Sequence, residues 1–190
     1  ELDRITAGTI NIGNSNSGLI SVTGVISPAN YKTLSAQNSV AFTSTGGFDS
    51  DVASLTVFEK MLAAGAVSID PAAALTATAI GGFVPAHGNS FTMIENTTGS
   101  GTTGTFAGKP EGGSLTLGGV NAFITYAGGT GANDVVINVD NLAPKVTSTT
   151  PAQAAVGVAT NSNVTLNFSE AVNIAAGGIT VDCGGVQAFA

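Results

Sequence analysis

The chain has 190 residues, of which 43% are hydrophobic and only 9% charged, and it holds 26 glycines and no tryptophan. This apolar content excludes a chain that stays unfolded for lack of a core, and the composition favours short strands with tight turns over long helices. The formal net charge is −7 and the five basic residues are scattered, which argues against a nucleic-acid surface and against binding to an anionic membrane.

Short runs of alternating apolar and polar residues recur over the first 80 positions. Ile10 and Ile12 are followed ten residues later by Ile20 and Val22, with a turn-rich segment, 13–18, between them. Such spacing is typical of a sandwich, a barrel or a solenoid, and low charge favours the solenoid because charges between stacked rungs would stay unpaired. We predict parallel, in-register strands over residues 1–80. We expect the following side chains to point inward: Ile10, Ile12, Ile20, Val22, Val40, Phe42, Leu55, Val57, Val67 and Ile69.

Residues 52–64 fit two structures. Val52, Leu55, Phe58 and Leu62 lie at helical spacing, and Gly65 could end a helix there. A short helix or broad turn around 58–64 and a continued strand therefore both remain open.

The segment 88–140 differs in character, because its apolar runs are separated by close turns. We predict strands over 90–95, 114–117, 121–126 and 134–139, with a Gly/Thr-rich loop over 96–104. Short turns between such strands are typical of antiparallel hairpins. We expect these hairpins to cover the last rung, whose unpaired backbone groups would otherwise invite aggregation.

A boundary is predicted at Asp140–Pro144. Beyond it, 145–149, 163–168 and 179–181 are strand-like, which amounts to half a sandwich. Because residue 1 lies inside a patterned segment, we expect the chain to be cut from a longer protein. Because three Ig-like strands cannot close a two-sheet sandwich, we also expect that protein to continue past Ala190. The predicted organisation is rungs over 1–87, a terminal capping module over 88–140, a linker over 141–144 and a partial Ig-like domain over 145–190.

Three stretches resemble known families. LDRITAGTINIG at 2–13, with LISVTGVIS at 19–27, resembles repeats of giant haemagglutinin-like surface proteins. SFTMIEN at 90–96, GTFAGKPEG at 104–112 and ITYAGGTGANDVV at 124–136 resemble the end of an autotransporter-type β-strand repeat region. Residues 144–172, with STTP at 148–151 and NFSE at 167–170, are similar to a bacterial Ig-like module of S-layer and other extracellular proteins.

The resemblance implies an all-β chain: a right-handed parallel β-solenoid with a hairpin-rich terminal part, then an incomplete Ig-like β-sandwich. It implies a structural or adhesive, non-catalytic role on a secreted or cell-surface bacterial protein. Two alternatives stay open: a module that binds a glycan or protein, and an accessory region of a secreted hydrolase whose catalytic domain lies outside this chain. An aromatic row would favour sugar binding, whereas the nine Phe and two Tyr are few and favour a stalk.

The residues support no catalytic, cofactor-binding or transition-metal site. His87 is the single histidine and lies in a predicted exposed turn, so a Ser–His–Asp arrangement or a zinc site lacks partners. Asp49 and Asp51 would share one face only on a regular strand, as a glycosidase pair requires. Arg4 is the only arginine in the chain, so a lyase would have no other arginine to bind a substrate carboxylate.

One turn resembles a calcium motif. Gly128-Gly129-Thr130-Gly131-Ala132-Asn133-Asp134 matches the nonapeptide G-G-x-G-x-D except for one inserted residue. That motif works through stacked copies, and this chain has one. Calcium binding and a plain glycine-rich turn are the two interpretations.

Cys183 is the only cysteine, so no disulfide can form within the chain. Some of the similar Ig-like modules pair a cysteine here with a later one, which implies a partner beyond Ala190. The alternative is a small buried hydrophobic residue that stays reduced. Because three strands cannot close a sandwich, we expect Val164, Leu166, Phe168, Ile179 and Val181 to lack part of their cover.

Overall fold

The computed structural model describes residues 5–27, 32–140, 142, 144–159, 161–169, 172, 174, 175, 178–182 and 186–189. These residues form strands and turns and no helix. The chain divides into an N-terminal unit, Glu1–Asn141, and a C-terminal unit, Leu142–Ala190.

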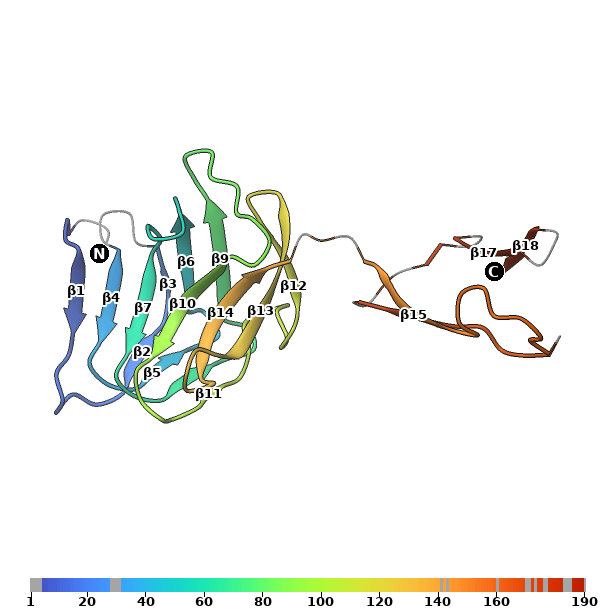
Figure 1. Ribbon diagram of the computed structural model, residues 1–190. Coiled ribbons are helices and arrows are strands. Elements are labelled where there is room, and N and C mark those ends of the chain that lie inside the picture. Colours follow the sequence, from blue (N-terminus) through green and yellow to red (C-terminus); the bar gives the residue numbers. More distant parts are fainter. Residues whose placement is uncertain are drawn as a thin grey trace. The chain divides into compact units, whose positions relative to one another are not determined.

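The described residues of the N-terminal unit form three sheets, in which the parallel neighbours are strands far apart in the sequence. Its strands are β1 Thr9–Ile12, β2 Ile20–Val22, β3 Val25–Ile26, β4 Thr33–Ala36, β5 Val40–Phe42, β6 Gly47–Val52, β7 Lys60–Ala63, β8 Val67–Ile69, β9 Ala74–Ala79, β10 Ser90–Asn96, β11 Thr102–Thr103, β12 Ser114–Leu117, β13 Val120–Gly128 and β14 Asp134–Val139. The sheet orders are β1-β4-β7-β10-β14-β13-β12, β11-β8-β5-β2 and β3-β6-β9. Figure 1 shows β1, β4, β7 and β10 side by side along the unit.

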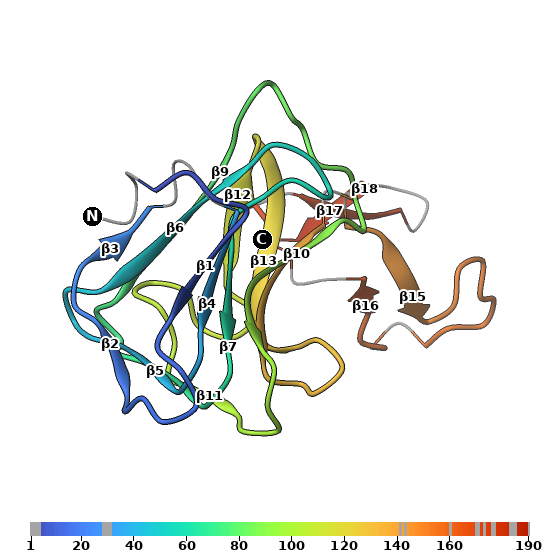
Figure 2. The ribbon, with the colours of Figure 1, turned by 90° about the vertical axis from the view of Figure 1, so that its left-hand side faces the viewer.

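Consecutive strands from β1 to β9 belong to the three sheets in turn, so that every third strand lies in the same sheet. We call each set of three a rung: β1–β3, β4–β6 and β7–β9, with β10 and β11 starting a fourth. All pairs between neighbouring rungs are parallel and free of register shifts. This confirms the predicted parallel, in-register strands over the first 80 residues, and Figure 2 shows the three sheets around one interior.

Exact register places apolar side chains directly above one another. Ile10, Leu34, Met61 and Ile94 form one row across the first sheet. Corresponding rows in the other sheets join Val22, Phe42 and Ile69, and Ile26, Phe48 and Leu75. The rows meet in one hydrophobic core, because a single rung has no core of its own and depends on its neighbours for cover.

Most of the predicted inward positions are confirmed, and one is wrong. Val22, Val40, Phe42, Val67 and Ile69 are buried, and Ile10, Ile12 and Ile20 pack partly buried against them. Val57 is half-buried. Leu55 is 52% exposed, because 53–57 is a turn in which the Ser54 hydroxyl accepts hydrogen bonds from the backbone N–H groups of Thr56 and Val57.

The open question at 58–64 is settled in favour of a strand. β7 covers Lys60–Ala63, with Met61 and Ala63 buried on its inner face. It pairs in parallel with β4 on one side and β10 on the other. Pairing on both edges outweighs the helix propensity of Glu59-Lys60-Met61-Leu62, which is a weak preference.

The expected hairpins are confirmed after residue 88. β12 pairs antiparallel with β13, and β13 with β14, which in turn pairs antiparallel with β10. The predicted loop 96–104 is partly wrong, because it contains β11, which pairs in parallel with β8. The first sheet therefore changes from parallel to antiparallel pairing at β10.

The C-terminal unit consists of two hairpins. Its strands are β15 Val146–Thr150, β16 Thr165–Phe168, β17 Ile179–Asp182 and β18 Val186–Phe189, paired as β15–β16 and β17–β18. No residue whose exposure is described in this unit is buried. Val164 is exposed while Leu166, Phe168 and Ile179 are half-buried, as expected; Cys183 and the side chain of Val181 lie outside the described residues.

Candidate functional site

The most concentrated group of buried polar side chains lies where β10 leaves β14. β10 pairs with β14 through Ile94 and Val135, with a register shift between Thr92 and Ile94. Beyond this point three polar residues replace the regular ladder: Asn96 at 5% exposure, Asn133 at 3% and Asp134 at 8%. Buried polar groups need hydrogen-bond partners, and each of these three has them.

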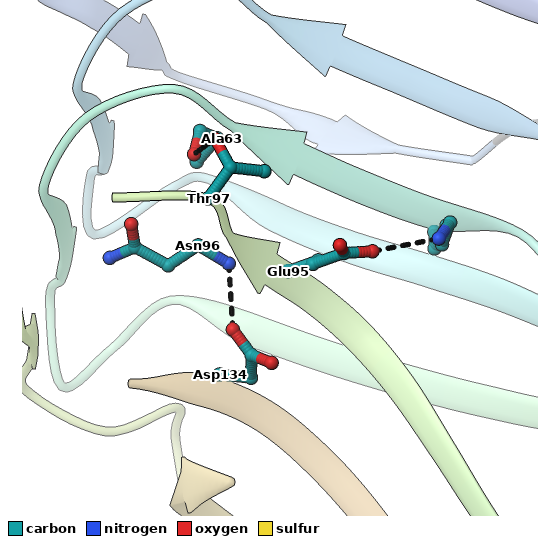
Figure 3. A network of polar contacts seen from close by, with 6 residues as sticks. Ala63, Glu95, Asn96, Thr97 and Asp134 are labelled. Carbon is teal, nitrogen blue, oxygen red and sulfur yellow. Dashed lines mark hydrogen bonds and ion pairs between the residues drawn. The ribbon is translucent and has the colours of Figure 1, made fainter. Parts of the chain in front are cut away.

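Asp134 continues the pairing with its side chain. Its Oδ1 atom accepts a hydrogen bond of 2.8 Å from the backbone N–H of Asn96 (Figure 3). Desolvation by burial raises the pKa of the Asp134 carboxyl; the Asn96 N–H opposes this rise, the charge of Glu95 adds to it and that of Lys60 opposes it. Lys60 Nζ on β7 lies 2.8 Å from Glu95 Oε2 on β10.

Asn133 organises the loop that follows β10. Its Nδ2 lies 3.3, 2.5 and 3.2 Å from the carbonyl oxygens of Asn96, Thr98 and Ser100. The Asn96 side chain completes the arrangement, because Oδ1 accepts from the Thr98 N–H and hydroxyl and Nδ2 donates to the Ser100 carbonyl. The Thr102 hydroxyl donates to the Asn133 carbonyl at 2.5 Å. The loop 97–101 is thus wrapped around two asparagine side chains.

The loop is also tied to the third rung. Both the backbone N–H and the hydroxyl of Thr97 donate to the carbonyl of Ala63, at 2.9 and 3.1 Å (Figure 3). The cluster therefore joins three parts of the chain: the end of β7, the end of β10 and the turn before β14. We call it the Asn–Asp clamp, defined as Asn96, Asn133 and Asp134.

The turn that resembles the calcium motif belongs to this clamp. At Gly129, with φ +68°, an added Cβ would lie 1.9 Å from Asp134 Oδ2, and at Gly128 it would lie 2.3 Å from Val136 Cγ2. The two glycines are therefore needed because Asp134 and Val136 approach the backbone closely. The Asp134 carboxylate accepts a hydrogen bond from a backbone N–H group, and the Asn133 amide donates to backbone carbonyls. Within the described parts of the chain, no group of three or more His, Cys, Asp and Glu side chains could hold a metal ion.

The other candidate side chains are not brought together with the clamp. His87 lies in an exposed turn, with Nδ1 3.2 Å from Asp140 Oδ1. Asp49 and Asp51 do share one face of a regular strand, since Phe48, Ser50 and Val52 alternate with them as buried residues of β6. Arg4 lies outside the described residues.

Sequence reasoning missed the third acid beside this pair. The Glu59 carboxylate accepts a hydrogen bond from the Asp51 N–H, and its backbone N–H donates to the Asp51 carbonyl. Desolvation raises the pKa of Glu59 to about 6, opposed by the Asp51 N–H and assisted by the charges of Asp51 and Asp49. A bridge between Val52 and Phe58 brings Glu59 back beside β6. The intervening residues 53–57, Ala-Ser-Leu-Thr-Val, give no clear sequence signal for this return.

Aromatic side chains line the interior. Phe42 and Phe106 meet edge to face at 5.3 Å, and Phe58 and Phe91 at 5.5 Å. Among the aromatic side chains that the structure describes, only Phe123 is exposed, at 37%. These side chains therefore form no row on an outer face.

These features define an all-β protein in which the side chains of the main buried polar cluster bond to the protein's own backbone. Residues 140–185 match the family model described as bacterial Ig-like domain. Such domains are common in extracellular and surface proteins and serve as structural or surface modules. No curated protein and no solved structure was found to match the chain. The described residues include no helix long and apolar enough to cross a membrane.

Proposed function

We propose that this chain is a non-catalytic structural segment of a secreted or cell-surface bacterial protein. In this proposal the N-terminal unit is a right-handed parallel β-solenoid that acts as a stalk. Residues 88–140 close one end of it, as in autotransporter-type repeat regions, and an Ig-like module follows. The structure and the Ig-like match support the all-β, modular character on which the proposal builds.

The observation that carries the proposal is the continuity of one core from the rungs into the terminal hairpins. Phe106, 1% exposed, follows β11 and packs against Phe42 of the second rung and Tyr126 of β13. Leu117 and Ile124 of the hairpins belong to the same buried cluster as Leu34 and Val40. Residues 88–140 therefore cover apolar surface that the third rung would otherwise expose.

Deletion of residues 88–140 tests the capping role. The remaining rungs should aggregate, because β7–β9 would present an apolar surface and unpaired strand edges. A matched control removes residues 142–190 instead, and this chain should stay soluble and folded by circular dichroism. If residues 1–87 stay soluble and folded in the deletion chain, the capping role is overturned.

Binding assays separate the stalk from a glycan-binding module. Stacking of sugars requires exposed rings, and Phe123 is the one candidate in the described residues. We expect the immobilised chain to show no saturable binding on a panel of glycans and extracellular-matrix proteins. Saturable binding that Phe123→Ala abolishes, with Phe123→Tyr as the conservative control, would replace the stalk by a binding module.

A further inference from the structure

The last strand of the third sheet, β9, keeps a free edge in a part of the chain, 32–140, that is described without a gap. Among the described residues, only β6 pairs with β9. The N–H groups of Ala74 and Ile80 donate to carbonyls of β6, and backbone groups alternate between the two sides of a strand. Leu75, Ala77 and Ala79 therefore turn their N–H and C=O groups away from β6, and no described strand pairs with them.

The free edge of β9 lies beside that of β12 and is bounded at both ends. β9 and β12 are neighbours in space but do not pair. At the start of β9 the Ala107 N–H donates to the Ala73 carbonyl at 2.8 Å. At its end, an added Cβ on Gly118, in the turn after β12, would lie 3.1 Å from the Ala79 Cβ (Figure 1). We call the region between these contacts the β9–β12 seam, bordered by Ala74–Ala79 and Ser114–Leu117.

Apolar side chains on both strands of the seam lack part of their cover. Ala77 and Ala79 pack against the core but are half-buried, whereas the residues paired with them on β6, Ser50 and Val52, are fully buried. Leu115 of β12 is likewise half-buried. The core is therefore closed on the β6 side of β9 and incompletely covered on the side of the seam.

The edge of β9 carries none of the features that prevent strand addition. Natural sheets use short edge strands, charged side chains, proline and bulges for this purpose. β9 has six residues, without charge or proline, and its pairing with β6 shows no register shift. By contrast β11, at one edge of the second sheet, has only two residues.

We propose that the β9–β12 seam binds one extended peptide segment of a partner, which adds a strand to β9 and carries Lys or Arg on its outward side. Main-chain hydrogen bonds to Leu75, Ala77 and Ala79 would supply affinity, and alternate side chains would supply specificity. Small apolar side chains on the inward side would complete the cover of Ala77, Ala79 and Leu115.

The outer face of the third sheet determines the charge of the partner. Asp49 and Asp51 lie on the outward face of β6, with Glu59 beside them, and β3, β6 and β9 contain no Lys or Arg. An added strand would lie two strand spacings, about 10 Å, from β6, where long basic side chains can extend towards these acids. A second copy of β9 suits the edge less well, because two-fold pairing would place both acidic faces on the same side.

Fluorescence anisotropy with two labelled hexapeptides tests the proposal on the full 190-residue chain. Both peptides are blocked at their ends and contain valine at every second position; one has lysine and the other glutamate between the valines. We expect saturable binding of the lysine peptide and binding of the glutamate peptide that is weaker by about tenfold or more. Absence of saturable binding by the lysine peptide, or equal binding of the two, overturns the proposal.

Variants locate the site. Ala77→Pro removes an N–H that β6 does not use, and edge strands tolerate proline, so peptide binding should be lost while the circular dichroism spectrum is retained. Ala77→Ser keeps the N–H and should bind normally. Asp49→Asn with Asp51→Asn should weaken the lysine peptide by about 3- to 10-fold, whereas Glu95→Gln on the first sheet should not. Unchanged affinity in the double variant overturns the proposal even if Ala77→Pro does not fold.

Hydrogen exchange on the unchanged chain gives a readout that needs no variant. The amides of Leu75, Ala77 and Ala79 should exchange more slowly with the lysine peptide bound, and those of β4 should not. Protection only outside β9 overturns the proposal, as does a dimer of the free chain, seen by light scattering, that Ala77→Pro dissociates. Such results leave the stalk role standing, because capping by 88–140 does not depend on this edge.

Discussion

At the residue scale, Glu59 makes the stability of the N-terminal unit depend on pH. Its pKa is raised to about 6 in the folded chain by desolvation, so the folded state binds a proton more tightly than the unfolded state. The contribution of Glu59 to stability is therefore fully present below its unfolded pKa of 4.5 and is lost as the pH rises through its folded pKa of about 6.

We expect the free energy of unfolding to be higher at pH 5 than at pH 7.5, by less than about 2 kcal/mol for Glu59, since the half-exposed group is screened by solvent. Glu59→Gln keeps an acceptor for the Asp51 N–H and removes the charge, so its pH dependence should be flatter. Urea titrations of both chains at the two pH values measure the difference. If the free energy of unfolding changes equally with pH in the two chains, Glu59 is not the group responsible.

The Asn–Asp clamp makes a distinct prediction at the same scale. Asp134→Ala leaves the buried Asn96 N–H without its acceptor, which costs about 1–3 kcal/mol of stability. Asp134→Asn retains Oδ1 as an acceptor and removes a desolvated charge, so it should remain close to the unchanged chain. Denaturant melts of the three proteins at pH 7.5 decide the matter; an equal loss in both variants would mean that the charge, and not the acceptor, matters.

Calcium is predicted to leave the clamp unaffected. Asp134 Oδ1 and the Asn133 amide are already satisfied by backbone groups, and the raised pKa of Asp134 reflects an unfavourable environment for its charge. The melting temperature should be the same with excess CaCl₂ and with EDTA. A calcium-dependent rise that Asp134→Asn removes would establish the turn as a calcium site.

At the element scale, the Tyr126 side chain on β13 holds the segment 106–112 through two hydrogen bonds of its hydroxyl. Its hydroxyl accepts a hydrogen bond from the Phe106 N–H at 2.9 Å and donates to the Lys109 carbonyl at 2.7 Å. Tyr126→Phe keeps the ring and should destabilise the unit by about 1–3 kcal/mol, because both backbone groups lose a partner. Amide exchange at Phe106 should accelerate in this variant, whereas exchange in β4 should change only with global stability.

Elements with strong local alternation were predictable from the sequence, and those held by distant partners were not. The alternating pairs Val40/Phe42 and Val67/Ile69 predict β5 and β8, because apolar residues two positions apart share one face of a strand. β11 has two residues and exists through its pairing with Val67 and Ser68 of β8. Leu55 fits the same apolar pattern but falls in a turn, which only the local serine hydrogen bonds reveal.

The clamp shows the same division. The glycine-rich turn was located from its motif, but its role depends on Asn96, which lies 37 residues before Asn133 in the sequence. No periodicity links two such positions. The partners become visible only once β10 and β14 are placed side by side.

At the scale of the whole molecule, the two units are expected to differ in resistance to protease. The N-terminal unit has a continuous core, whereas no residue with described exposure in the C-terminal unit is buried. Local opening therefore costs little in 145–190. Limited proteolysis followed by mass spectrometry should yield a fragment ending near residue 141 first; initial cleavage within 33–79 would contradict this order.

The position of β14 determines how the N-terminal unit responds to mechanical tension. The chain leaves this unit directly after Val139, and β14 lies between β10 and β13 with hydrogen bonds to both. A pull transmitted from the C-terminal side therefore loads an interior strand, and two ladders must shear together before it slides out. Had the chain left from β12, the outermost strand of that sheet, the same pull could have peeled one ladder bond by bond.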